Sequence, residues 1–139
     1  MLSDTNNKLK EHLREEVFSN WDGTELRIVP QRFTAYFFIT LHCVYCIDLI
    51  PCLNEIKDRY PNVDIVLLSS GSQEDHKEMV EYFQWDFPLI EMERLEMHKH
   101  FDVTMQPYMI IVDADRIIHS STVVYTKEDV LRMYEAHIK

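Results

Sequence analysis

The chain has 139 residues, enough for one domain that buries roughly two-thirds of the surface its unfolded chain exposes. Hydrophobic residues make up 46% and charged residues 27%, which is the composition of a folded globular protein and not of a disordered one. The net charge of −10 argues against nucleic acids and anionic membrane surfaces as partners, because both are bound through clustered lysine and arginine side chains.

We expect a monomeric protein of the cytosol, with no membrane partner. The first eight residues are polar and lack the apolar core of a signal peptide, and no apolar stretch approaches the length of a membrane span. Three cysteines are too few for a disulfide scaffold. We expect a single domain over residues 1–139, with an N-terminal helical extension at 1–24 and a core at 25–139.

The spacing of apolar residues changes repeatedly along the chain, which predicts strands that alternate with helices. The first predicted elements are a helix through Leu9, Leu13 and Val17, a turn at 20–23, strands at 26–29 and 33–39, a helix at 43–59 and a strand at 63–68. Next come a helix capped by Ser72 with Met79, Val80 and Phe83, a strand at 87–90, a helix at 95–100, a hairpin of 108–112 with 117–119, and a helix capped by Thr126 with Val130, Leu131 and Tyr134 buried. This order predicts an α/β sandwich with a mixed central β-sheet flanked by helices.

Cys43 and Cys46 lie where the aromatic 33–39 strand gives way to the helix that follows it. The free N–H groups and the dipole of a helix N-terminus stabilise a negative charge by about 0.3–2 kcal/mol. The thiolate, which is the reactive form of cysteine, is such a charge. The spacing therefore predicts a dithiol–disulfide switch, in which Cys43 attacks a partner disulfide and Cys46 resolves the mixed disulfide. Since Val44 and Tyr45 add no cation between the cysteines, we expect a reductase or a mild oxidant.

From about Phe33 to the C-terminus, the chain resembles the thioredoxin-like thiol–disulfide oxidoreductases, because three landmarks of that family occur in it in the same order. They are the strand–CxxC–helix unit, Pro51 in the helix after the second cysteine, and the loop 103–107 before an apolar strand. A further helix and the 87–90 strand precede that loop, an insertion similar to the TlpA/ResA branch, which shares it with peroxiredoxins. The resemblance implies a thioredoxin-like three-layer sandwich with a TlpA-type helix–strand insertion. The branch includes small cytosolic members associated with peptide-antibiotic biosynthesis, such as that of the sporulation killing factor.

The resemblance also implies a substrate site around the two cysteines. Pro107 is expected to follow a cis peptide bond, so that the backbone of Gln106 pairs with an extended substrate peptide. His42 and Tyr45 are expected to form the exposed rim of that site. The implied partners are a protein or peptide with cysteine thiols or a disulfide, a peptide natural product among them, and an upstream redox partner. No metal and no organic cofactor is expected, because the two thiols carry the electrons.

Two positions depart from the family pattern. His42 stands where a tryptophan usually precedes the first cysteine, and Phe37 stands at the position of thioredoxin's buried aspartate. The route by which protons reach and leave the second cysteine is therefore not the usual one. Cys52, six residues after Cys46, is expected to be a core or spectator cysteine.

Three other functions are compatible with parts of the sequence. His42, Cys43 and Cys46 offer three zinc ligands, but a structural zinc site needs a second matched pair, which the sequence lacks. Thr40 and Cys43 match the TxxC end of the peroxiredoxin signature, although Tyr36 replaces its proline. The third alternative is a non-catalytic thioredoxin-like module that binds a partner through the Gln106–Pro107 face, for which two intact cysteines would be unnecessary.

Overall fold

The structure, a computed structural model, describes residues 17–138. Its strands are β1 (Val17–Ser19), β2 (Glu25–Arg27), β3 (Thr34–Thr40), β4 (Asp64–Ser70), β5 (Leu89–Glu91), β6 (Tyr108–Val112) and β7 (Ile118–Val123). Its helices are α2 (Val44–Leu49), α3 (Leu53–Arg59), α4 (Gln73–Phe83), α5 (Arg94–Phe101) and α6 (Lys127–His137), with the 3₁₀ turn η1 (Ile50–Cys52) between α2 and α3.

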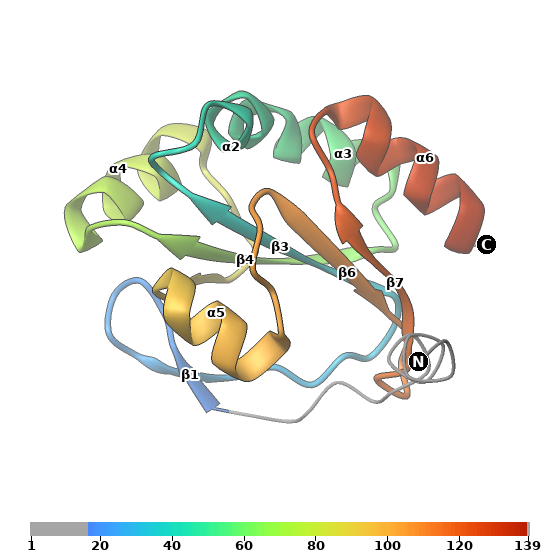
Figure 1. Ribbon diagram of the computed structural model, residues 1–139, viewed down its shortest axis with the longest axis horizontal. Helices are drawn as coiled ribbons and strands as arrows, with labels where there is room; N and C mark the ends of the chain where they lie inside the picture. Colours follow the sequence, from blue (N-terminus) through green and yellow to red (C-terminus); the bar gives the residue numbers. More distant parts are fainter. Residues whose placement is uncertain (1–16, 139) are drawn as a thin grey trace.

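A mixed five-stranded sheet in the order β5-β4-β3-β6-β7 forms the centre of the molecule (Figure 1). β3, β4 and β5 run parallel to one another, and β6 runs antiparallel to its neighbours β3 and β7. Every residue of β3 is buried, because helices or the β1–β2 hairpin cover both faces of the sheet at this strand. This explains why the sequence of β3 is continuously aromatic and β-branched instead of alternating.

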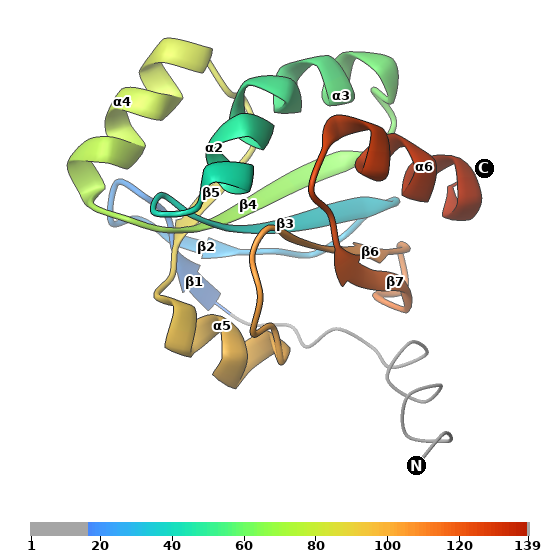
Figure 2. The ribbon, with the colours of Figure 1, turned by 45° about the horizontal axis from the view of Figure 1, so that its top comes forward.

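The helices and the hairpin form the two outer layers. α2, α3, α4 and α6 lie on one face of the sheet, and α5 and the β1–β2 hairpin lie on the other (Figures 1 and 2). The predicted three-layer sandwich with a mixed sheet is confirmed, including the additional strand β5 beside β4. Within residues 17–138, no helix is both long and apolar enough to span a membrane.

The helix predicted through Leu9, Leu13 and Val17 is wrong at Val17, which lies in a strand, whereas the turn predicted at 20–23 is confirmed. The helix expected through Leu9 and Leu13 lies outside the described residues, but residues 17–24 form β1 and a turn. Val17 is 49% exposed, whereas its neighbour Phe18 packs on the ring of Phe101 with centroids 5.8 Å apart. Burial therefore alternates along this segment, which suits a strand and not a helix.

The helix predicted over residues 43–59 is interrupted at Pro51, where the family resemblance implies a kinking proline, and it forms three segments. Pro51 lies in η1, between α2 and α3. Proline has no N–H to donate to the carbonyl of Ile47, four residues earlier, and its ring crowds that carbonyl. The regular α-helix therefore stops at Leu49 and starts again at Leu53. The predicted caps of the later helices are confirmed: Ser72 accepts an N–H from α4, and Thr126 forms a capping box at α6.

A buried histidine joins α4 to the sheet. The sequence placed an apolar face around Met79, but the most buried side chain of α4 is His76, which has no exposed surface. Its Nδ1 lies 2.9 Å from Oε2 of Glu91 on β5, and its Nε2 lies 2.9 Å from Oγ of Ser69 on β4. Both ring nitrogens therefore have a partner on the sheet, which satisfies the polar atoms that burial removes from water.

We expect His76→Ala to lower the free energy of unfolding by about 2–4 kcal/mol, because it opens a cavity and leaves the buried Ser69 hydroxyl without this partner. Urea unfolding of the reduced protein, followed by circular dichroism, measures the change. His98→Ala is the matched control: His98 is exposed on α5, so its loss should change stability by less than about 0.5 kcal/mol. Equal effects of the two substitutions would contradict a stabilising role for His76.

Candidate active site

Cys43 and Cys46 lie at the junction of β3 and α2. Cys43 is the N-cap residue of α2, with an extended backbone (φ −116°, ψ 126°) and a carbonyl that accepts the N–H of Ile47 at 3.0 Å. This is the position at which the free N–H groups of the first helical turn stabilise a negative charge. Cys43 is partly exposed, whereas Cys46 has no exposed surface and belongs to the main hydrophobic core. One sulfur is therefore accessible to a partner and the other is not.

Burial determines the state of Cys46. Desolvation raises the pKa of the Cys46 thiol to about 12, the neighbouring Cys43 adds to the rise, and the backbone N–H of Thr40 opposes it by donating to Sγ at 3.5 Å. Cys46 is therefore a neutral thiol near pH 7 and must lose a proton before it can attack. Phe37, at the position of thioredoxin's buried aspartate, is fully buried and has no group that could accept this proton.

The loop before β6 lies against the first cysteine. The peptide bond between Gln106 and Pro107 is cis, as expected from the sequence. The Cys43 thiol lies 3.7 Å from the carbonyl oxygen of Gln106, to which it donates. On the far side of the cis bond, the carbonyl of Pro107 accepts the N–H of Val124 at 3.1 Å, which connects the loop to the end of β7. The expected juxtaposition of this loop and Cys43 is thus confirmed, while the binding roles of Gln106 and Pro107 stay predictions.

A cleft of about 540 Å³ opens beside Cys43. The cleft is lined by the end of β3 and the loop after it, the end of β4, the start of α5 and the loop before β6. The lining residues are Thr40, His42, Cys43, Ser70, Glu93, Arg94, Thr104, Met105 and Gln106. His42 therefore lies where the sequence placed it. Tyr45 does not line the cleft; it is 53% exposed and its ring packs edge-on against Tyr125 with centroids 5.1 Å apart. The predicted rim is thus divided between the cleft and a separate aromatic pair.

Sequence reasoning missed several residues of this cleft, among them Ser70, Glu93 and Arg94. Ser70 ends β4, and because β3 and β4 are parallel, its position at the same sheet edge as the cysteines could have been inferred. Arg94 begins α5, and no local sequence pattern indicates its place.

Gly71 leaves space for the side chain of Leu41, which lies in the loop between β3 and α2. A Cβ atom at this position would lie 2.5 Å from Cδ1 of Leu41 and 3.2 Å from Nε2 of His76. Leu41 also donates its N–H to the carbonyl of Ser70 at 3.1 Å, so the loop after β4 and the loop before α2 are in close contact. The glycine leaves space for the Leu41 and His76 side chains, and its φ lies outside the left-handed region, so no unusual backbone conformation requires it.

A family model described as thioredoxin-like matches residues 31–118. The chain belongs to the thioredoxin-like family. It is similar to the methylamine utilization protein MauD of Methylobacillus flagellatus, with 24% identity over 108 residues that cover 78% of this chain and 52% of that protein. This thioredoxin-like chain therefore spans about half the length of the curated relatives it matches.

Solved structures of thioredoxin-like proteins share the fold. The thioredoxin domain of a thiol–disulfide oxidoreductase from Bacteroides vulgatus superposes with a TM-score of 0.75 at 14% identity, covering 92% of this chain and 96% of that one. A peroxiredoxin-like protein from Aquifex aeolicus superposes with a TM-score of 0.73 at 14% identity, covering 92% and 86%. Since this fold is common to both kinds of protein, the arrangement of the cysteines must distinguish their chemistries.

Neither a zinc site at the two cysteines nor a redox role for Cys52 is supported by the structure. Within residues 17–138, no three histidine, cysteine, aspartate or glutamate side chains form a group that could hold a metal ion, so His42, Cys43 and Cys46 do not make a zinc site there. Cys52 is partly buried and donates its thiol to the carbonyl of Asp48 at 3.7 Å, away from the cleft.

We expect iodoacetamide to modify Cys43 in the folded, reduced protein and to leave Cys46 largely unmodified between about pH 7 and 9. Cys46 is enclosed by the core, and its raised pKa keeps it protonated throughout this range. Peptide mass spectrometry after timed alkylation measures both rates. In guanidinium chloride the two cysteines should react at similar rates, which controls for local sequence. Equal rates in the folded protein would show that Cys46 is not shielded.

Proposed function

We propose that the protein is a thiol–disulfide oxidoreductase that exchanges electrons with a protein or peptide substrate through Cys43 and Cys46. The observation that carries this proposal is the unequal environment of the two sulfurs: Cys43 is accessible at a helix N-terminus, and Cys46 is enclosed one turn later. A nucleophile needs access to its substrate, whereas a resolving thiol needs access only to the nucleophile. A non-catalytic binding module would need neither property.

In the reducing direction, the Cys43 thiolate attacks one sulfur of a substrate disulfide. The substrate S–S bond breaks, its second sulfur leaves as a thiolate and takes up a proton, and a mixed disulfide forms on Cys43. Cys46 then loses its proton and attacks the Cys43 sulfur, which releases the first substrate sulfur as a thiol. The substrate gains two electrons and two protons, and the protein gains a Cys43–Cys46 disulfide. An upstream dithiol reverses this change; with an oxidising partner, all steps run backwards.

The loop beside Cys43 supports an extended peptide as the substrate. The carbonyl of Gln106 lies at the lip of the cleft, 3.7 Å from the attacking sulfur, where a peptide backbone N–H could replace the thiol as its donor. His42 and Met105, both exposed, line the same cleft and would contact side chains next to the substrate cysteine. A peptide natural product is one candidate substrate, on the resemblance to antibiotic-associated members of the TlpA/ResA branch. The cytosolic location stays a prediction.

We expect the Cys43–Cys46 pair to undergo a single two-electron transition with a potential nearer to about −270 mV than to −120 mV, because the residues between the cysteines carry no charge. Equilibration in a thiol redox buffer, followed by alkylation and mass measurement, gives the value. A potential near that of strong oxidants would reverse the expected direction. If no Cys43–Cys46 disulfide forms at any redox poise, the proposal fails and the binding module takes its place.

Single substitutions should separate the roles of the two sulfurs. Cys46→Ser should accumulate a mixed disulfide on Cys43 when treated with hydroxyethyl disulfide, because nothing resolves it. Cys43→Ser should form no mixed disulfide at Cys46, which is enclosed. Cys52→Ser is the matched control and should behave as the unsubstituted protein does. A mixed disulfide on Cys46 in Cys43→Ser would contradict the assigned order.

A further inference from the structure

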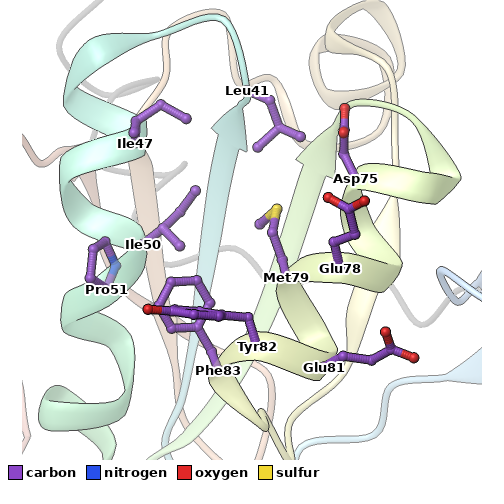
Figure 3. A pocket seen from close by; sticks show the side chains of 10 residues that line it. All are labelled: Leu41, Ile47, Ile50, Pro51, Asp75, Glu78, Met79, Glu81, Tyr82 and Phe83. Carbon is purple, nitrogen blue, oxygen red and sulfur yellow. The ribbon is translucent and has the colours of Figure 1, made fainter.

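A second concave surface begins beside the cysteine loop. It is a groove of about 860 Å³ between the α2–η1 segment and α4, with Leu41 at the end nearest the cysteines (Figure 3). We call it the α2–α4 groove; its apolar walls are formed by Leu41, Ile47, Ile50, Met79, Tyr82 and Phe83. It shares no lining residue with the cleft beside Gln106.

The walls of the α2–α4 groove leave large apolar side chains in water. Ile47 is 46% exposed and Tyr82 is 81% exposed, although both face a partly buried apolar floor that includes Met79. Covering such surface removes it from water, which is the main driving force of association. Ile47 also donates its N–H to the carbonyl of Cys43, so the groove starts one helical turn from the attacking residue.

The rim of the α2–α4 groove is acidic. Asp75, Glu78 and Glu81 follow one another along α4 and line the same groove (Figure 3). None of the described residues that line it is a lysine or an arginine. An apolar floor with an acidic rim suits a peptide that carries an apolar side chain next to a cationic one.

The chain itself makes a second copy a poor occupant. Its net charge is −10, so a second molecule would bring further negative charge to the acidic rim. A basic segment of a different molecule gains both the apolar contact and the charge attraction.

We propose that the α2–α4 groove binds the part of the substrate that flanks its reacting cysteine, and that this flank carries an apolar residue and lysine or arginine. The inference rests on the proposed function, because Cys43 fixes where the substrate cysteine lies. The groove starts one helical turn, about 5.4 Å, from Cys43 and extends beyond it along α2, and an extended chain advances about 3.3 Å per residue. The apolar residue is therefore expected about two to four positions from that cysteine. The cleft beside Gln106 receives the cysteine, and the α2–α4 groove selects the sequence around it.

The test uses two synthetic peptides, each with one cysteine activated as a disulfide with 2-thiopyridine. Both carry leucine three positions away on each side; one continues with lysines and the other with glutamates. When the Cys43 thiolate attacks the peptide sulfur, 2-thiopyridone leaves and its absorbance reports the rate. We expect the basic peptide to react about tenfold faster at low salt, and this advantage to shrink as salt screens the charges.

Charge-reversal variants locate the effect. Glu78→Lys should reduce the advantage of the basic peptide about fivefold, whereas Glu135→Lys, the same change on the exposed surface of α6, should leave it unchanged. Tyr82→Ser should slow both peptides about threefold, because it removes an apolar wall without touching the core. Equal sensitivity to the two lysine substitutions would mean that overall charge, and not the groove, selects the peptide, and would overturn the inference.

Hydroxyethyl disulfide, which is small and uncharged, separates this inference from the proposed function. If it fails to react with Cys43, the proposed function fails. If it reacts but the two peptides do not differ, the oxidoreductase stands and the α2–α4 groove has no role in selection. If Glu78→Lys changes the molecular mass measured by light scattering and leaves the peptide rates unchanged, the groove is a contact between copies, which also overturns the inference.

Discussion

The antiparallel pairing of β3 with β6 is the constraint on which the whole site depends. Phe38 lies opposite Tyr108, so the chain leaves β3 and enters β6 at the same edge of the sheet. The residues that follow β3 lead to Cys43, and the residues that immediately precede β6 are Gln106 and Pro107. Because β3 is buried along its whole length, a shift of one residue would turn its core side chains to the opposite face. The packing of the sheet therefore fixes the contact between two loops that are 63 residues apart.

The same packing gives two chemically identical side chains different properties. Cys46 lies in the core cluster with Phe37 and Leu49, and the low polarity of that cluster is what holds its proton. Cys43 lies at the surface of the same helical turn, where the N-cap position and the Gln106 carbonyl are its neighbours. No acid or base has to distinguish the two thiols, because burial does so. The different properties that the proposed function requires of the two thiols therefore follow from hydrophobic core packing.

Structural elements could be predicted from the sequence where the residues that determine them lie next to one another in the chain. The buried strand before Cys43 and the caps at Ser72 and Thr126 follow from neighbouring residues, and the structure agrees with them. The cis bond before Pro107 is implied by the family resemblance and not by the neighbouring residues, and it is also confirmed. The CxxC spacing likewise placed both cysteines of the candidate site. Pro51 is a landmark at which the family pattern implies a kink, and the structure has a 3₁₀ turn there.

What could not be predicted depends on contacts between distant segments. His76 lies in a polar, acidic stretch, and only the fold brings Ser69 and Glu91 to its two ring nitrogens. Val17 fitted a helical repeat, but pairing with Arg27 made it part of a strand. The α2–α4 groove has no sequence signature either, since its walls come from the α2–η1 segment and α4, which α3 and β4 separate in the chain.

The enclosure of Cys46 has a kinetic consequence for partner choice. In the proposed mechanism, a mixed disulfide on Cys43 has two fates: Cys46 attacks it and completes the reaction, or the thiolate just released by the partner returns it to the starting state. Because Cys46 is enclosed in the core and has to lose a proton before it attacks, the forward route is slow in this mechanism and the covalent intermediate lives longer. Contacts that stabilise this intermediate then raise the fraction that goes forward. In the proposed mechanism, selection among partners therefore begins with the first attack and continues during the lifetime of the covalent complex.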